Sequence, residues 1–224
     1  MLFHQTDDSF IRIYDDIGYI SNQLSKTDRV YDDIGSVFLG QLQRRPRDFE
    51  DAVKELASYF KNTNTDGIRY DFGEFLSDLE NDGFIVTGES KDELDSKAPR
   101  FSYSDPLSKT LPQTRYETNG GHPDTSEFLY DYFKQNPKIF SFQMELTSRC
   151  NEKCRHCYLP GARDMRDMET SLALSLLDQA AEDGTLGLTL SGGECLLHKD
   201  FIPILEYARK RDFSISILSN VTLL

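Results

Sequence analysis

The feature that most constrains the fold is an alternation of short apolar runs and amphipathic stretches over residues 139–220. Segments with helical periodicity, at about 169–183 and 200–211, separate the apolar runs "IFSFQMELT", "LGLTLS" and "FSISILSN". Strands that alternate with helices of about ten to fifteen residues indicate a parallel sheet of βα units joined by right-handed connections. With a short helix expected at about 125–135, the sequence predicts an α/β fold for the C-terminal part of the chain.

Each predicted strand ends in a polar or cysteine-rich segment. The segment "CNEKCRHC" follows the first strand, "SGGE" ends the second, and Ser219 and Asn220 close the third. Because the carboxyl ends of parallel strands meet at one edge of a sheet, we expect the three segments to lie together. A simple strand-end turn is an equally good interpretation of Ser219 and Asn220 taken alone.

Cys150, Cys154 and Cys157 are three of the four cysteines in the chain, in a C-x3-C-x2-C spacing. No export signal precedes them, so we expect a reducing compartment, where clustered thiols serve as metal ligands or catalytic groups rather than disulfides. A 4Fe–4S cluster can be held by three thiolates, with its fourth iron open to another ligand. The spacing favours this cluster over zinc, and free thiols come third. Zinc would need a further ligand, for which the chain offers His156, Cys195 and His198.

The two motifs together resemble the core of the radical S-adenosylmethionine (SAM) superfamily, in which "CNEKCRHC" follows one strand and "SGGE" ends the next. The resemblance implies a partial (β/α)6 barrel in which Cys150, Cys154 and Cys157 hold a 4Fe–4S cluster. The open iron would bind the amino and carboxylate groups of SAM. An electron donor such as flavodoxin or ferredoxin would reduce the cluster. The reduced cluster would then cleave SAM and generate a 5′-deoxyadenosyl radical.

The same resemblance implies a SAM pocket in this chain. His156 matches the position beside the adenine, and the turn "GGE" matches the one that receives the methionine ammonium. Glycines let a backbone approach a ligand closely, and Glu194 offers negative charge to a cation. Cys195, next in the chain, is expected to be a small packing residue. The positions that match the SAM pocket are His156, Gly192, Gly193, Glu194, Ser219 and Asn220.

In the N-terminal part of the chain, strands precede helices. The stretch "FIRIYDDIGYISNQLSKTDRVYD" alternates apolar and polar residues in short runs, which is typical of two or three antiparallel strands. Three stretches with helical spacing follow, with Asp48 and Asp66 as expected N-caps and Gly83 as an expected helix stop. "GFIVTGE" adds a short strand or wing. The sequence predicts an α+β winged-helix-like domain over residues 1–90.

This order of elements ahead of a radical SAM core resembles the peptide-recognition element of enzymes that modify ribosomally made peptides. Such elements are similar to the small peptide chaperone of pyrroloquinoline-quinone biosynthesis. The resemblance implies that a leader peptide adds a strand at Arg29, Val30 and Tyr31 and packs against the third helix, at Phe72 and Phe75. Binding the leader would raise the local concentration of the attached core peptide to about the millimolar range. The alternative is a structural cap without a ligand.

Charge and composition restrict the partners and the domain limits. The formal net charge of −13, with five acidic residues on the third predicted helix, argues against a nucleic-acid partner and suits a leader with basic residues. No apolar run reaches the roughly 18 residues of a membrane span, so we expect no membrane partner and a cytoplasmic location. Residues 91–124 carry prolines and little periodicity, which predicts a linker between domains at 1–90 and 125–224.

The chain stops just after the third predicted strand, whereas cores of this superfamily generally have six βα units. We therefore expect a fragment that is inactive alone. The expected reaction of the whole enzyme is hydrogen abstraction from a precursor peptide, followed by formation of a crosslink. Two alternatives stay open at this stage: a radical SAM maturase that acts on a folded protein, and a non-enzymatic peptide-binding module whose cysteines hold zinc.

Overall fold

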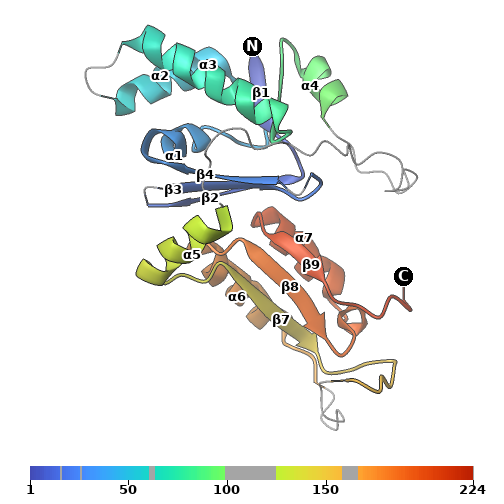
Figure 1. Cartoon of the computed structure of the whole chain (residues 1–224). Coiled ribbons are helices and arrows are strands. Elements are labelled where there is room, and N and C mark those ends of the chain that lie inside the picture. The colour runs from blue at the N-terminus through green and yellow to red at the C-terminus, as the bar shows by residue number, and fades with distance from the viewer. Residues whose placement is uncertain (16, 26, 61–63, 99–124, 158–165, 224) are drawn as a thin grey trace. The chain divides into compact units, whose positions relative to one another are not determined.

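The computed structural model describes residues 1–15, 17–25, 27–60, 64–98, 125–157 and 166–223. The chain divides into two compact units, Met1–Tyr132 (unit 1) and Phe133–Leu224 (unit 2). Unit 1 contains two small antiparallel sheets and unit 2 contains a parallel sheet, so the fold is a mixed α and β one (Figure 1). No helix among the described residues is long and apolar enough to cross a lipid bilayer.

The first sheet of unit 1 is a meander of β2 (Ser9–Tyr14), β3 (Ile17–Asn22) and β4 (Thr27–Asp32). β3 lies in the centre and pairs antiparallel with both neighbours. Asp15 follows β2 with a φ of 50°, a left-handed conformation that aspartate tolerates in turns. The strands predicted from the alternating pattern are confirmed.

The second sheet of unit 1 was predicted only in part. Its central strand, β1 (Leu2–Gln5), pairs with β5 (Arg47–Asp48) on one side and β6 (Ile85–Gly88) on the other. The strand expected at "GFIVTGE" is confirmed as β6. β1 was missed because four residues are too few to show a period, and its partners lie far along the chain.

Three helices follow the meander: α1 (Asp33–Leu39), α2 (Phe49–Tyr59) and α3 (Thr65–Asn81). Asp48 caps α2 as predicted, since its carboxylate accepts the N–H of Asp51 at 3.1 Å. The predicted cap of α3 is wrong. Asn64 caps that helix by accepting the N–H of Asp66 at 3.1 Å, so Asp66 lies in the first turn. Gly83, with a φ of 76°, lies just beyond the helix end in a conformation that stops helices.

An aromatic cluster forms the core of unit 1. The ring of Phe72, on α3, lies 5.2–5.7 Å from the rings of Phe3, Phe38 and Phe49, measured between centroids. Such pairs contribute about 0.5–1.5 kcal/mol each beyond the burial of their surface. The cluster joins β1, α1, α2 and α3, and its aliphatic members are Ile20, Leu39, Ala52, Val53, Leu56, Ile68, Leu76, Leu79 and Ile85.

The segment predicted as a linker begins with a helix, α4 (Lys91–Lys97). Ser90 caps it by accepting the N–H of Glu93 at 3.2 Å, and Leu94 is its buried residue. Two turns with a single buried residue give too little periodicity to be recognised next to a proline-rich stretch. The rest of the predicted linker, residues 99–124, lies outside the described residues. Helix α5 (Thr125–Gln135) has the predicted bounds.

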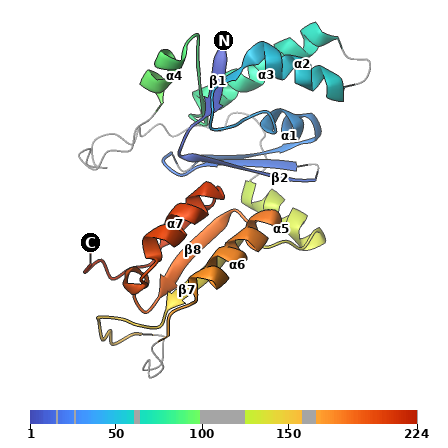
Figure 2. The same ribbon diagram turned by 180° about the vertical axis from the view of Figure 1, so that it is seen from behind.

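Unit 2 is built on β7 (Ser141–Thr147), β8 (Gly187–Gly192) and β9 (Ser214–Ile217), which pair in parallel in that order. α6 (Thr170–Glu182) connects β7 to β8, and α7 (Phe201–Lys210) connects β8 to β9. Both helices cover the same face of the sheet (Figure 2). The predicted parallel α/β sheet is confirmed. Its core is largely aliphatic and includes Met144, Leu146, Ala173, Leu177, Leu188, Leu190, Ile204, Ala208 and Phe213.

Candidate functional site

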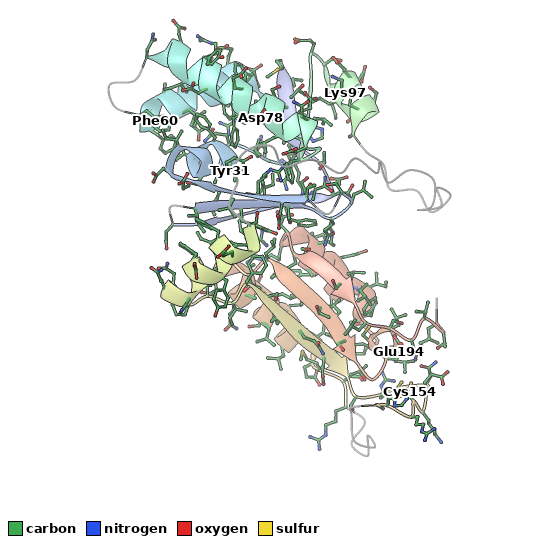
Figure 3. The ribbon with its side chains drawn as sticks, in the orientation of Figure 1. Tyr31, Phe60, Asp78, Lys97, Cys154 and Glu194 are labelled. Atoms are coloured by element: carbon green, nitrogen blue, oxygen red, sulfur yellow. The ribbon has the colours of Figure 1, made fainter. Side chains whose placement is uncertain are left out.

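The three segments predicted to converge lie together at the carboxyl ends of the parallel strands. The cysteine loop follows β7, the glycine turn and a short 3-10 helix, η1 (Cys195–Leu197), follow β8, and Ser219 and Asn220 follow β9. Figure 3 shows Cys154 and Glu194 at this end of the sheet. β7 shifts register against β8 between Glu145 and Thr147, an irregularity that redirects the chain just before the loop.

Cys150, Cys154 and Cys157 are exposed on the loop and form no disulfide. The sulfur of Cys150 accepts the backbone N–H of Glu152 at 3.4 Å and the side-chain amide of Asn220 at 3.9 Å, which suits a thiolate ligand. Within the described part of the chain, no three potential ligands converge into a metal-binding group. The donor set fits an iron–sulfur cluster in its chemistry, and the loop would have to draw the thiols together to hold one.

Gly192 and Gly193 let the turn after β8 lie directly against the end of β7. A Cβ on Gly192 would overlap the carbonyl oxygen of Thr147, and one on Gly193 would overlap that of Arg149. The backbone uses this approach, because the N–H of Gly193 donates to Thr147 and the N–H of Glu194 donates to Arg149, both at 2.8 Å. The glycines were predicted to make room for a ligand. In the structure they bring two strand ends together.

Glu194 is fully buried, whereas the predicted contact with an ammonium group requires an accessible carboxylate. Its Oε1 accepts the N–H of Leu196 at 3.1 Å. Its Oε2 accepts the N–H of Asn220 at 2.7 Å and the hydroxyl of Ser219 at 3.1 Å. The carboxylate therefore ties the turn after β8 to the segment after β9, and binding of an ammonium would need its remaining lone pairs.

Asn220 connects the third segment to the cysteine loop. Its side-chain nitrogen donates to Oδ1 of Asn151 at 2.9 Å, and the side-chain nitrogen of Asn151 donates to the hydroxyl of Thr222 at 2.7 Å. The structure therefore brings Cys150, Glu194, Ser219 and Asn220 into one network, as the topology predicted. His156 lies on the same loop and is exposed.

Two of the three candidates for a fourth zinc ligand, Cys195 and His198, are enclosed by the fold. The buried ring of His198 is bonded at both nitrogens, to the N–H of Asp200 at 3.1 Å and to the carbonyl of Met168 at 2.8 Å. Cys195 packs in the core of unit 2, as expected of a small packing residue. Burial and the nearby carboxylate of Glu194 raise the pKa of the Cys195 thiol to about 11, which opposes a thiolate at neutral pH. His156 is the one of the three that lies exposed on the loop.

Sequence reasoning missed Arg149 and Asp167, which join the two ends of the cysteine loop. Nε and Nη2 of Arg149 donate to the two carboxylate oxygens of Asp167, at 2.9 and 2.7 Å, and the hydroxyl of Thr147 donates to the same carboxylate at 2.6 Å. These hydrogen bonds, the one from Arg149 first, hold the pKa of Asp167 below its usual range. The available signal was an arginine directly before Cys150, but its partner lies 18 residues further along.

The residues predicted to bind a peptide lie on β4, at the edge of the meander, and on α3. Arg29 pairs with Asp82, the residue directly after α3, at 3.0 Å, and the ring of Tyr31 lies 5.0 Å from that of Phe75. Val30, between them, is half-buried. Phe72 differs from the prediction, because its ring is 0% exposed in the core and does not reach the surface. Among the described strands, β4 pairs only with β3.

Acidic groups of α3 lie close to this edge. Burial is the main cause that raises the pKa of Tyr31 to about 12. Arg29 opposes the rise, and the carboxylates of Asp82 and Asp78 add to it. Tyr31 on β4 and Asp78 on α3 are marked in Figure 3. The strand edge is therefore bordered by aromatic rings and by negative charge.

Comparison with known proteins agrees with the chemistry of the carboxyl edge. Residues 144–224 match the family model described as the radical SAM superfamily. The antilisterial bacteriocin subtilosin biosynthesis protein AlbA of Bacillus subtilis is 33% identical over 81 residues, which are 36% of this chain and 18% of AlbA. The PqqA peptide cyclase of Xanthomonas oryzae is 41% identical over 75 residues, which are 33% of this chain and 20% of the cyclase. The chain thus spans about a fifth of the length of these curated relatives.

A solved structure has a similar fold. Streptococcus suis SuiB bound to S-adenosylmethionine superposes with a TM-score of 0.50 over 99% of this chain and 43% of SuiB, at 14% sequence identity. This likeness concerns the fold alone. The family match covers β8 and β9, the last part of β7, the cysteine loop and the glycine turn. The part of the chain that matches the radical SAM superfamily, residues 144–224, therefore forms most of unit 2.

Proposed function

We propose that the protein is a radical SAM enzyme that modifies a ribosomally made precursor peptide, with unit 1 binding the leader and unit 2 generating the radical. One observation carries the proposal: the loop with three exposed cysteines lies beside the glycine turn, at the carboxyl edge of a sheet that matches the superfamily. The similarity to a peptide cyclase and to a bacteriocin biosynthesis protein favours a peptide substrate. The proposed reaction is hydrogen abstraction followed by a crosslink.

Membership in the superfamily implies a 4Fe–4S cluster and SAM as cofactors. Cys150, Cys154 and Cys157 are the residues that would hold the cluster. When bound, the cluster supplies the electron that cleaves SAM and yields a 5′-deoxyadenosyl radical, and a flavodoxin or ferredoxin would restore that electron. The chain itself positions the site, since Glu194 orients the segment after β9 and the glycine turn holds the end of β7. The proposed SAM pocket comprises His156, Gly192, Gly193, Glu194, Ser219 and Asn220.

For unit 1 we propose a winged-helix-like peptide-recognition fold over residues 1–90, with 91–124 as linker and 125–224 as part of the radical SAM core. A leader would add a strand along Arg29, Val30 and Tyr31, because β4 has a strand partner on one side only among the described residues. Its side chains would meet Tyr31 and Phe75, whose rings are half-buried between β4 and α3. Backbone bonds would give affinity and these rings specificity.

The charge of this edge favours a leader with basic residues. Arg29 is already paired with Asp82 at 3.0 Å, so the cation nearest the edge is neutralised. The carboxylates that α3 presents beside this edge are exposed to water. These carboxylates would attract a lysine or arginine of the leader and would repel a glutamate at the same place. The acidic residues that border the edge are Asp28 and Asp32 on β4 and Asp71, Glu74 and Asp78 on α3.

Anaerobic reconstitution of the full-length gene product tests the radical SAM function. We expect about four irons per chain, broad visible absorption, and 5′-deoxyadenosine formed from SAM after reduction. Cys154→Ala should lose both the iron and the product. Cys195→Ala is the matched control and should keep its iron, because Cys195 lies in the core and outside the ligand set. A colourless wild-type protein with one bound zinc would overturn the proposal.

A pair of synthetic peptides tests the peptide-binding edge of the same protein. One decapeptide alternates leucine with lysine and the other leucine with glutamate, each labelled for fluorescence anisotropy. We expect the lysine peptide to bind, Asp78→Lys to weaken it about tenfold, and the glutamate peptide not to bind. Asp92→Lys, on exposed α4, is the matched control. Equal binding of both peptides, or an equal loss in the control, would contradict the proposed edge. Failure of both peptides to bind would favour an enzyme that acts on a folded protein.

A further inference from the structure

The chain segments on either side of the cysteine loop are hydrogen-bonded to each other. The N–H of Ser148 donates to the carbonyl of Arg166 at 3.0 Å, and the N–H of Arg166 donates to the hydroxyl of Ser148 at 2.9 Å. Thr147 forms an isolated antiparallel bridge with Asp167. The cysteines therefore lie on a loop whose neck, residues 147–149 and 166–168, is closed.

Arg149 connects this neck to the segment that contains the glycine turn. Its guanidinium makes two bonds to Asp167, at 2.9 and 2.7 Å, and Nη2 also donates to the carbonyl of Leu197 in η1 at 2.5 Å. Its backbone carbonyl accepts the N–H of Glu194 at 2.8 Å. The residue directly before Cys150 thus bonds both to the far end of the loop and to the segment after β8.

We propose that Arg149 and Asp167 are positioning residues: they form a latch that holds Cys150 in register with the Gly192–Glu194 turn, so that a cluster on the loop faces the SAM pocket. A planar guanidinium can bond both oxygens of a carboxylate through two nitrogens and still reach a carbonyl, whereas a lysine ammonium has all its donors on one nitrogen and cannot form that fork. The inference rests on the proposed role of the three cysteines as cluster ligands.

The exposure of the pair argues for a geometric role rather than a stabilising one. The side chains of Arg149 and Asp167 are 37% and 26% exposed. Ion pairs this open to water contribute little to the stability of a fold. The folding stability of unit 2 comes mainly from its aliphatic core, of which neither residue is a member. Loss of the latch should therefore change the position of the loop and leave the fold intact.

Unit 2 offers a matched control pair in Arg211 and Asp178. Their Nε and Oδ1 atoms lie 2.9 Å apart, and their side chains are 36% and 40% exposed. This pair joins α6 to the end of α7, just before β9 begins, at the amino edge of the sheet. It is an arginine–aspartate ion pair of similar exposure, away from the cysteine loop.

The first readout uses the full-length protein without metal, so it does not depend on the cofactors. Arg149→Lys and Asp167→Asn are compared with Arg211→Lys and Asp178→Asn by amide hydrogen exchange over residues 147–157 and 192–197. We expect about tenfold faster exchange in the latch variants, and wild-type exchange in the controls. Wild-type exchange in the latch variants would overturn the inference. So would equal acceleration in the controls, because general loosening would then explain both.

The second readout follows anaerobic reconstitution with iron and sulfide. We expect the latch variants to bind less iron than the wild type and to lose the change that SAM causes in the electron paramagnetic resonance spectrum of the reduced cluster. Latch variants with the wild-type spectrum and the wild-type response to SAM would overturn the positioning role. If the wild-type protein takes up no iron but the latch variants still show faster hydrogen exchange, the role of the cysteines as cluster ligands is refuted. The latch would then only hold the two ends of the loop together. The two failures are therefore distinguishable.

Discussion

The two units differ in what determines their local structure. In unit 1, side-chain packing determines the local structure, because aromatic rings from β1, α1, α2 and α3 meet in one cluster around Phe72. At the carboxyl edge of unit 2, backbone contacts determine the local structure. The strand ends are joined by backbone hydrogen bonds at the glycine turn and by the buried carboxylate of Glu194. Substitutions should therefore act through lost packing in unit 1 and through lost backbone register in unit 2.

The largest expected effect is that of Phe72→Ala in unit 1. Removal of a fully buried ring that contacts four others should lower the free energy of unfolding of unit 1 by about 3–5 kcal/mol. Tyr70→Ala, on the same helix but 68% exposed, should change it by less than about 0.5 kcal/mol. Hydrogen exchange of peptides from unit 1 in increasing urea measures both. Similar effects of the two substitutions would show that the aromatic cluster does not determine the stability of unit 1.

The same contrast explains how much of the fold the sequence could predict. The meander, the three parallel strands and every described α-helix except α4 have a local period, and these were recognised; α4 was missed because it has two turns and one buried residue. β1 has only four residues and becomes a strand through pairing with β5 and β6, so no local pattern marks it. The cap of α3 was misplaced by two residues because Asn64 and Asp66 are both good caps, and backbone geometry decides between them.

The candidate site shows the same division. Spacing and topology predicted that the cysteines, the glycine turn and the end of β9 meet, and they do. The individual contacts could not be predicted. The buried carboxylate of Glu194 accepts hydrogen bonds from Ser219 and Asn220, and Arg149 pairs with Asp167, 18 residues further along the chain. Such contacts depend on the path of the chain in three dimensions, which the one-dimensional pattern does not contain.

The second prediction concerns the backbone contact at the glycine turn. Gly193→Ala places a Cβ against the carbonyl of Arg149, which should force the strand ends apart and lower the stability of unit 2 by about 3 kcal/mol. Gly67→Ala is the control, because its Cβ would have no neighbour within 4 Å. That change lies in α3 and should stabilise unit 1 by about 0.5–1 kcal/mol. Urea unfolding followed by hydrogen exchange gives both values, and a neutral Gly193→Ala would contradict the contact.

The third prediction tests the buried carboxylate. In Glu194→Gln, one carboxylate oxygen becomes an amide that faces a donor, either the N–H of Leu196 or the groups of Ser219 and Asn220. A buried donor without an acceptor should lower the stability of unit 2 by about 2 kcal/mol. Glu206→Gln, at an exposed position of α7, should have no measurable effect. If Glu194→Gln unfolds as the wild type does, the carboxylate does not tie the two strand ends together.

The smallest expected effect changes a rate and leaves the fold unaltered. Near neutral pH, iodoacetamide should modify the exposed thiols of Cys150, Cys154 and Cys157 in the metal-free protein and leave Cys195 unmodified. Its thiol is buried in the core, and its pKa, raised from 9.0 to about 11, keeps it protonated until the solution becomes strongly alkaline. Since the folded pKa lies above the unfolded one, the stability linked to this thiol is complete below pH 9 and declines as the pH rises through 11.

Peptide mapping by mass spectrometry measures the modification of each cysteine, and protein in urea, where all four should react, is the control. The result sharpens the comparison of the two units, because Cys195 lies directly after Glu194 and reports whether the turn after β8 stays closed. If Cys195 reacts as fast as the loop cysteines, the turn opens in solution without unfolding of the chain. Backbone register at the carboxyl edge would then be transient, and the contrast with the aromatic core of unit 1 would be one of dynamics as well as of structure.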